Sequence, residues 1–265
     1  MQELVLVGND GYVKLVDWMG GDISAVNAAR ASYMKEIREM RPADERLLSF
    51  LSENGHTSPF RHAFVTVEIK APIMVARQWF KYRVGSAHTG DTAELLGIEI
   101  PPEFLAAIAW GGQGDDGAHG FGDLLQGRNE ASRRYITLHP DFYIPSIWRG
   151  APASSKQGSS GAVPENISSE ATKRLLEITS AALDAYEWAL SAGICAEQAR
   201  LFLPAYSLYT VWRWTASLQS LQHFLSQRLG HDAQSEIREY AEAVLRVTEP
   251  IFPASLKKIK EFSRE

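Results

Sequence analysis

Hydrophobic and polar positions along the chain predict several short strands. Apolar residues recur in residues 2–7 and 12–16, and Asn9-Asp10-Gly11 between them is a turn signal. These stretches therefore predict an antiparallel hairpin. Another β-prone run spans residues 64–69, and an aromatic-rich one spans residues 206–214, which is the composition typical of strands.

Helical spacing of apolar residues predicts most of the other elements. We expect Asp22 to cap a helix that runs to Tyr33, and Pro42 to begin a helix that ends near Asn54-Gly55. Pro72 is expected to open the next one. In the second half of the chain, a long helix should begin near Ser168 and stop at Gly193, followed by helices over residues 196–203, 217–228, 233–247 and 251–262.

Two stretches lack such a pattern. Between Gly85 and Arg128 glycines recur, and only Pro102 to Trp110 has a brief helical pattern. A structureless stretch of this length within a compact domain is usually a lid, a binding loop or a disordered segment. Because strands and helices share no clear boundary, we predict one α+β domain over residues 1–265, with an insert at 87–128 and a loose loop at 150–165.

Composition narrows the class of protein. Of the 265 residues, 45% are hydrophobic and 22% are charged, and the net charge is −5, so a nucleic-acid-binding surface is not expected. The single cysteine, Cys195, excludes an internal disulfide and a multi-cysteine metal site, which fits a reducing cytoplasm. No signal segment or membrane-length apolar run is present. We expect a soluble cytoplasmic protein without a metal site.

Candidate chemistry lies in two separated stretches. Arg77, Lys81 and Arg83 place three cations in seven residues on an otherwise apolar segment, so a bound phosphate is a natural partner. In the second stretch Glu130, Ser132 and Arg134 are spaced by two. On an extended segment they point to one side, which directs an acceptor, a hydroxyl and a cation at one ligand.

These stretches resemble the flavin-dependent thymidylate synthases, the ThyX family. The resemblance rests on Ala71 to Phe80 and on Phe142-Tyr143-Ile144-Pro145. Shorter fragments along nearly the whole chain support it, namely Asp22 to Val26, Ala28 to Arg30, Gly55-His56, Ser58 to Phe60, Ala199-Arg200, Leu203-Pro204, Ala233-Gln234 and Glu236-Ile237.

The family signature is split here. In the family, Arg-His-Arg is followed after seven residues by Ser-x-Arg-Tyr. This chain has Lys81-Tyr82-Arg83, and the serine half is found only at Ser132-Arg133-Arg134-Tyr135. Because 48 residues separate Arg83 from Ser132, 41 are additional. An inserted loop costs little stability and could be an ordinary surface loop. Since it interrupts the ligand-facing segment, we expect it to border the nucleotide site or a subunit interface.

The resemblance implies a fold and an activity. It implies a ThyX-like domain with a central antiparallel sheet and long flanking helices, assembled as a homotetramer with shared active sites. It further implies a methyltransferase that acts on C5 of a uracil mononucleotide, with bound FAD, methylenetetrahydrofolate as carbon donor and NADPH as reductant. No cysteine nucleophile is needed, and Cys195 has no His or Arg beside it in sequence, so we interpret it as structural.

Matched to the family position by position, the chain has residues that are expected to bind the nucleotide. The resemblance also implies the catalytic candidates Arg228, Ser132 and Tyr82. No general base neighbours Ser132 in sequence, so we expect it to bind and polarise rather than to attack. Without the resemblance, Arg200 and Arg228 would be read as surface ion-pairing residues. The expected substrate-binding residues are Gln78, Lys81, Glu130, Ser132, Arg133, Arg134, Arg200 and Arg228.

The flavin positions have diverged more. Tyr82 stands where the family has histidine and Lys81 where it has arginine. Lys81 offers a point charge but not a fork, and Tyr82 can stack or donate one hydrogen bond but is neutral at pH 7, so the flavin would be polarised differently. By composition alone, His56 would be a surface or capping histidine. The resemblance implies flavin contacts from Ser32, His56, Ser58, Arg61, Lys81, Tyr82, Arg83, Ser217, Gln219, His223 and Asp232.

Three functions stay open at this point. We favour a diverged enzyme that methylates UMP, as in the branch of the family that serves nucleoside-antibiotic biosynthesis. A standard thymidylate synthase that converts dUMP to dTMP is the first alternative. A uridylate-binding protein without catalysis is the second, motivated by the replacements at Lys81 and Tyr82.

Overall fold

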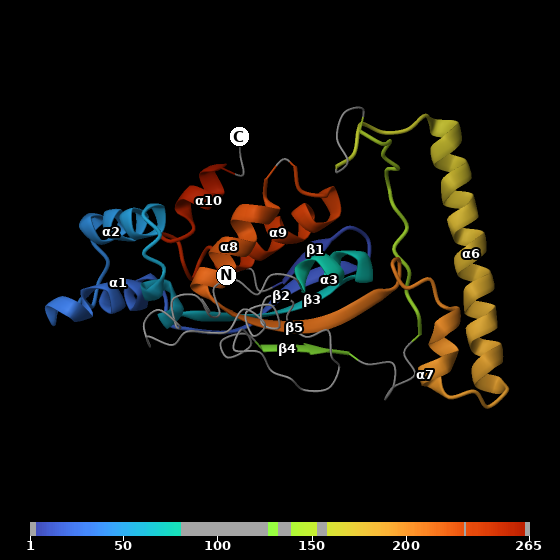
Figure 1. Ribbon diagram of the computed structural model, residues 1–265, viewed down its shortest axis with the longest axis horizontal. Coiled ribbons are helices and arrows are strands. Elements are labelled where there is room, and N and C mark those ends of the chain that lie inside the picture. The colour runs from blue at the N-terminus through green and yellow to red at the C-terminus, as the bar shows by residue number, and fades with distance from the viewer. Residues whose placement is uncertain (1–3, 81–126, 132–138, 153–157, 231, 263–265) are drawn as a thin grey trace, which may run out of the picture.

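The computed structural model describes residues 4–80, 127–131, 139–152, 158–230 and 232–262. A single antiparallel sheet organises them, with strand order β1-β2-β3-β5-β4 (Figure 1). The fold is α+β, as predicted from the sequence. Its strands are β1 Leu4–Val7, β2 Gly11–Met19, β3 Phe64–Pro72, β4 Gly127–Glu130 and β5 Tyr209–Ser217.

The predicted hairpin forms from β1 and β2, which pair antiparallel from Leu4 opposite Lys14 to Val7 opposite Gly11. Gly8 has φ +59° in the connecting turn, a conformation that glycine adopts without strain. Along β3, side chains alternate between buried and half-buried positions, because one face of the strand meets the core. The strand predicted at 206–214 is shifted to Tyr209–Ser217 and pairs along all of β3.

Helices cover the sheet at both ends and on one face (Figure 1). Most of the predicted helices are confirmed, with small shifts at their ends. Their bounds are α1 Asp22–Arg30, η1 Ala31–Tyr33, α2 Pro42–Glu53, η2 Ser58–His62, α3 Ile73–Trp79, α6 Glu165–Ser191, α7 Ala196–Ala199, η4 Arg200–Phe202, α8 Leu218–Arg228, α9 Ser235–Thr248 and α10 Lys257–Phe262.

Two sequence predictions about helix ends were wrong. Asp22 is not the cap of α1, since Gly21 holds that position. Its buried carboxylate instead accepts bonds from Ala254 N at 2.7 Å and from Ser255 N at 3.1 Å, which ties α1 to the distant C-terminal segment. The last helix begins at Lys257 rather than Ile251, because turns occupy the residues between them.

The main core is centred on Trp79, at the end of α3. Its ring stacks on Phe224 of α8 with centroids 4.2 Å apart. Its edge contacts lie at 5.5 Å from both Trp212 and Trp214 of β5. All four side chains are buried. The aromatic cluster therefore fixes where α3 ends relative to β5, which is also where the first half-motif stands.

A second, smaller core joins α6 to α7 and to the end of β5. Tyr186 and Ala189 of α6 are buried there against Leu203 and Leu208. The 27-residue helix α6 stands to one side of the sheet (Figure 1). It also carries the exposed side chains Ile167, Leu176, Ile178 and Trp188. Within the described residues, no helix has both the length and the apolar character to cross a membrane.

Candidate active site

The described ends of the two half-motifs lie side by side. Phe80 directly follows α3, and its ring meets the edge of Trp212 with centroids 5.4 Å apart. Glu130, at the end of β4, is paired with the same Trp212 in β5. The guanidinium of Arg128 also lies 4.1 Å from the centre of the Phe80 ring. Two stretches that are far apart in sequence thus meet on β5.

The first half-motif contributes Gln78. It is half-buried on the last turn of α3, and its Nε2 donates a hydrogen bond to Gln234 Oε1. Gln234 Nε2 in turn donates to Glu236 Oε2 at 2.8 Å. Glu236 lies in the first turn of α9 and is bound by Arg149 Nη2 at 2.8 Å and 2.7 Å through its two oxygens. A continuous hydrogen-bond path therefore leads from Gln78 to Arg149.

The second half-motif contributes Glu130. Its side chain is exposed, and its Oε1 accepts a bond from Thr210 Oγ1 at 2.8 Å. Because Thr210 belongs to β5, the contact holds the carboxylate against this neighbouring strand. The predicted residues Lys81, Tyr82, Arg83, Ser132, Arg133 and Arg134 lie outside the described residues, as does nearly all of the 87–128 insert.

Two further nucleotide candidates stand on helix ends. Arg228 is the last residue of α8 and is half-buried. Arg200 begins η4, is exposed, and its Nε donates to the carbonyl oxygen of Glu197 at 3.2 Å. The contacts of Arg200 are thus local, to the short helix that precedes it.

Several flavin candidates gather where η2 meets α8. Arg61 Nε donates to Gln219 Oε1 at 2.7 Å, although the two residues are 158 positions apart. Ser217 is the N-cap of α8, with its Oγ accepting from Ser220 N at 3.2 Å. His223 lies one turn after Gln219, and burial lowers its pKa, so its imidazole is neutral at pH 7.

The other flavin candidates among the described residues are exposed. Ser58 begins η2, and the ring of His56 stacks beside Phe50 with centroids 6.3 Å apart. Ser32 lies in η1, and Asp232 precedes α9. Packing of η2 against both α1 and α8 brings the surroundings of Ser58 and Gln219 together. The contacts of Ser32 and Asp232 provide no such link.

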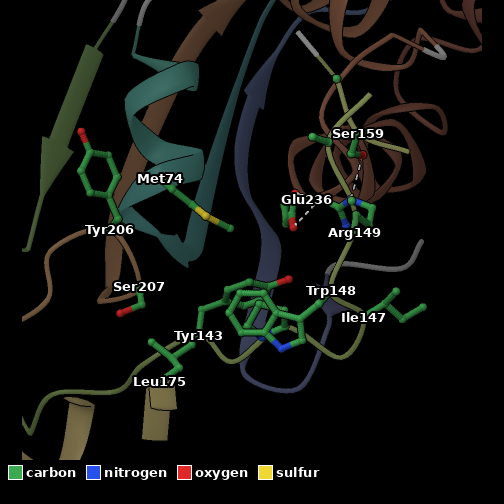
Figure 2. A pocket seen from close by; sticks show the side chains of 14 residues that line it. Met74, Tyr143, Ile147, Trp148, Arg149, Ser159, Leu175, Tyr206, Ser207 and Glu236 are labelled. Carbon is green, nitrogen blue, oxygen red and sulfur yellow. Dashed lines mark hydrogen bonds and ion pairs between the residues drawn. The ribbon is translucent and has the colours of Figure 1, made fainter. Parts of the chain in front are cut away.

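A cavity of about 460 Å³ opens beside α9 (Figure 2). Its wall includes Tyr143 and Trp148, and dashed lines in Figure 2 join Arg149 to Glu236 and to Ser159. Burial, followed by the negative charge of Glu236, raises the pKa of Tyr143 to about 12. Of the predicted site residues that the structure describes, none lines this cavity.

Sequence reasoning gave no role to Arg149, Gln234 or Glu236. The last two belong to the fragments Ala233-Gln234 and Glu236-Ile237, which carry part of the family resemblance. That resemblance was the available signal for them. Arg149 lies in an irregular segment, so no periodic pattern in the sequence indicated its contact with α9.

Comparison with known proteins identifies the family of this chain. The family model described as "Thymidylate synthase complementing protein" matches residues 14–90 and 126–254. The chain belongs to this family. The unmatched residues 91–125 lie within the stretch interpreted above as an insert.

Members of the thymidylate synthase complementing protein family with similar sequences bear a common name. A "Flavin-dependent thymidylate synthase" of Thermotoga neapolitana is 34% identical over 237 residues, which is 89% of this chain and 85% of the relative. The protein of that name from Thermus thermophilus is 34% identical over 251 residues, 95% of this chain and 76% of the relative.

A solved structure has the same fold. It is a UMP/dUMP methylase, PolB from Streptomyces cacaoi, bound with 5-Br dUMP. Its TM-score is 0.72 at 23% sequence identity, and the match covers 98% of this chain and 99% of that chain. The fold predicted from the resemblance is thereby confirmed.

Proposed function

We propose that this chain is a flavin-dependent methyltransferase that methylates C5 of a uracil mononucleotide and favours UMP. In this proposal methylenetetrahydrofolate donates the carbon and NADPH is the reductant. One observation carries it. The family match extends over both parts of the chain on either side of the insert, and the relatives with 34% identity are flavin-dependent thymidylate synthases.

The nucleotide would bind where the half-motifs meet on β5. The contacts of Phe80 and Glu130 with Trp212 support this placement, because they join the two parts of the split motif. Forked cations suit a phosphate, whereas amide and carboxylate groups suit an imide or sugar hydroxyls. The proposed residues are Gln78, Glu130, Arg200 and Arg228, together with Lys81, Arg133, Arg134 and the catalytic candidates Ser132 and Tyr82.

The donors gathered at η2 and α8 fit FAD. Arg61 offers a cation suited to a pyrophosphate, Gln219 an amide, and His223 a neutral imidazole. With His56, Ser58 and Ser217 they would hold the cofactor, with Ser32, Asp232 and Arg83 as further expected contacts. Bound FAD would supply the redox chemistry, while these side chains bind and orient it.

The preference for UMP rests on how far the first half-motif has diverged. Lys81 and Tyr82 replace arginine and histidine, and 41 residues are added next to them. Conversion of dUMP to dTMP is the second candidate, supported by the name that the relatives share. Turnover of UMP and dUMP with methylenetetrahydrofolate and NADPH separates the two. A strict preference for dUMP would refute the proposed preference.

Enzyme activity itself is tested with a matched pair of variants. Arg228→Lys keeps the charge and loses the forked donor, so we expect turnover to fall at least tenfold, the effect of about 1.4 kcal/mol. Arg246→Lys is the control, since Arg246 is an exposed residue on α9 with a 4.0 Å ion pair to Glu242. A colourless protein that does not take up FAD would instead support a uridylate-binding protein without catalysis.

Copies of this chain would assemble through α6. Its exposed Trp188 contacts the exposed Phe202 of η4 edge to face, and Ile178 of α6 and Leu201 of η4 are exposed as well. An apolar surface of this kind is typical of a subunit interface. We propose the homotetramer implied by the resemblance, in the reducing cytoplasm that the single Cys195 fits. Light scattering would measure the oligomeric mass, and a monomer would refute the assembly.

A further inference from the structure

The path from Gln78 to Arg149 has a chemical direction. A carboxylate can only accept hydrogen bonds, whereas each glutamine has an oxygen that accepts and a nitrogen that donates. Glu236 therefore requires the nitrogen of Gln234, and the observed contact is Gln234 Nε2 to Glu236 Oε2 at 2.8 Å. This leaves the oxygen of Gln234 to face Gln78, which must present its own nitrogen.

Glu236, the acceptor in this path, is held in its charged carboxylate form. Burial alone would raise the pKa of Glu236, but hydrogen bonds from Arg149 and Gln234 lower it below the ordinary value. The position of Glu236 in the first turn of α9 also favours a negative charge. The side chain of Glu236 is only 10% exposed, so water competes little for its oxygens.

The consequence for Gln78 is a fixed orientation of its amide. With Nε2 committed to Gln234, the carbonyl oxygen Oε1 is left for a partner outside this path. Ribose hydroxyls both donate and accept, so they would tolerate either orientation of the amide. The N3–H of uracil can only donate, and N3 of cytosine can only accept. Uracil recognition is therefore the case in which the orientation matters.

We propose that Glu236, acting through Gln234, is a positioning residue that holds Gln78 with its carbonyl oxygen toward the uracil N3–H and so excludes cytosine nucleotides. The inference rests on the proposed function, in which Gln78 binds the nucleotide. It adds that Glu236, which does not itself touch the nucleotide, determines which base is accepted.

Two variants of the holoenzyme separate orientation from stability. Glu236→Gln removes the charge and allows the side-chain amides of Gln78 and Gln234 to flip by 180°. Arg149→Gln breaks the same ion pair but leaves an acceptor-only carboxylate at 236. Binding of UMP and CMP is measured at pH 8 with the FAD-loaded protein. We expect Glu236→Gln to weaken UMP binding about tenfold, the worth of one hydrogen bond to a nucleotide group, and to narrow the difference between UMP and CMP. Arg149→Gln should change UMP affinity less than about threefold, with FAD affinity unchanged in both variants.

A double-mutant cycle shows whether the effect passes through Gln78. In a Gln78→Leu background, Glu236→Gln should have no further effect on UMP affinity. If Glu236→Gln and Arg149→Gln weaken UMP binding equally, or if the effect of Glu236→Gln persists in the Gln78→Leu background, the positioning role is refuted while the proposed function stands. A parent protein that binds neither UMP nor dUMP would refute the proposed function, and the positioning role with it.

Discussion

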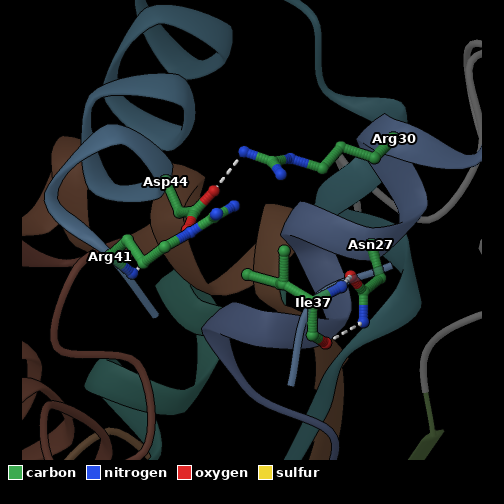
Figure 3. Close-up of polar contacts among 5 residues, drawn as sticks. All are labelled: Asn27, Arg30, Ile37, Arg41 and Asp44. Carbon is green, nitrogen blue, oxygen red and sulfur yellow. Dashed lines mark hydrogen bonds and ion pairs between the residues drawn. The ribbon is translucent and has the colours of Figure 1, made fainter. Parts of the chain in front are cut away.

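Replacement of Asp44 tests how the chain holds the segment that follows α1. Asp44 is fully buried in the first turn of α2, and its Oδ1 accepts a bond from Arg30 at the end of α1 (Figure 3). Its Oδ2 accepts from Arg41 N and Arg41 Nε, each at 3.0 Å. Asn27 adds two bonds to the backbone of Ile37, of 3.1 Å and 2.8 Å. Residues 31–40, which include the flavin candidate Ser32, are thus held from both ends.

The cost of Asp44→Ala follows from these contacts. Loss of the bond to Arg41 N, which caps α2, costs about 1 kcal/mol. Loss of the bond to the half-buried Arg30 costs about 2 kcal/mol, because that bond is charge-assisted. Loss of the contact with the Arg41 side chain, which is 59% exposed, costs little. We therefore expect the free energy of unfolding to fall by about 3 kcal/mol, or roughly 6–12 °C in Tm for a chain of this size.

Urea denaturation of Asp44→Ala and Asp44→Asn provides the measurement. Asn keeps one acceptor oxygen and should lose about half as much. Glu45→Ala is the control, since Glu45 is exposed on the same helix and its ion pair with Lys257 is 4.0 Å long. FAD affinity should also weaken in Asp44→Ala if Ser32 contributes to the cofactor site. A loss of stability below about 0.5 kcal/mol in Asp44→Ala would show that the reasoning about the buried carboxylate is wrong.

The same carboxylate predicts a pH dependence. The hydrogen bond from the Arg41 side chain, opposed by burial and helped by the charge of Arg30, lowers the pKa of Asp44 below its ordinary value of 3.8. A lowered folded-state pKa means that the stabilisation is complete above 3.8 and is lost as pH falls below that value. The difference in stability between the parent and Asp44→Asn should therefore shrink in urea titrations below about pH 4. A constant difference from pH 7 to pH 3 would contradict this.

Two further substitutions test the packing by urea denaturation. Gly11→Ala would place a Cβ 2.0 Å from the hydroxyl oxygen of Tyr240, so we expect a loss of about 2 kcal/mol, whereas Gly161→Ala, which meets nothing within 4 Å, should stay near the parent. Trp79→Ala removes the centre of the aromatic cluster and should cost about 3–5 kcal/mol. Trp18→Ala, at a side chain 47% exposed, should cost much less, and equal losses for the two tryptophans would refute the assigned core.

Local signals in the sequence determined the regular elements. The turn at Asn9-Asp10-Gly11, Pro42 at the start of α2 and Gly193 after α6 act on the backbone within a few residues, so they can be read without the fold. The two half-motifs were also visible, because residue type and spacing carry the family pattern. The proximity of their described ends, through Phe80 and Glu130 on Trp212, then emerged from the fold.

Only the tertiary structure decided which distant side chains meet. Asp22 looked like a helix cap because caps are local, yet its carboxylate binds a segment 232 positions away. The pairing of Arg61 with Gln219 and the path from Gln78 through Gln234 to Glu236 join separate elements. Such contacts depend on how the sheet and the helices pack, and the spacing of residues along the chain does not predict this packing. The sequence by itself therefore determined the elements and the family, and the fold decided the hydrogen-bond path that orients Gln78.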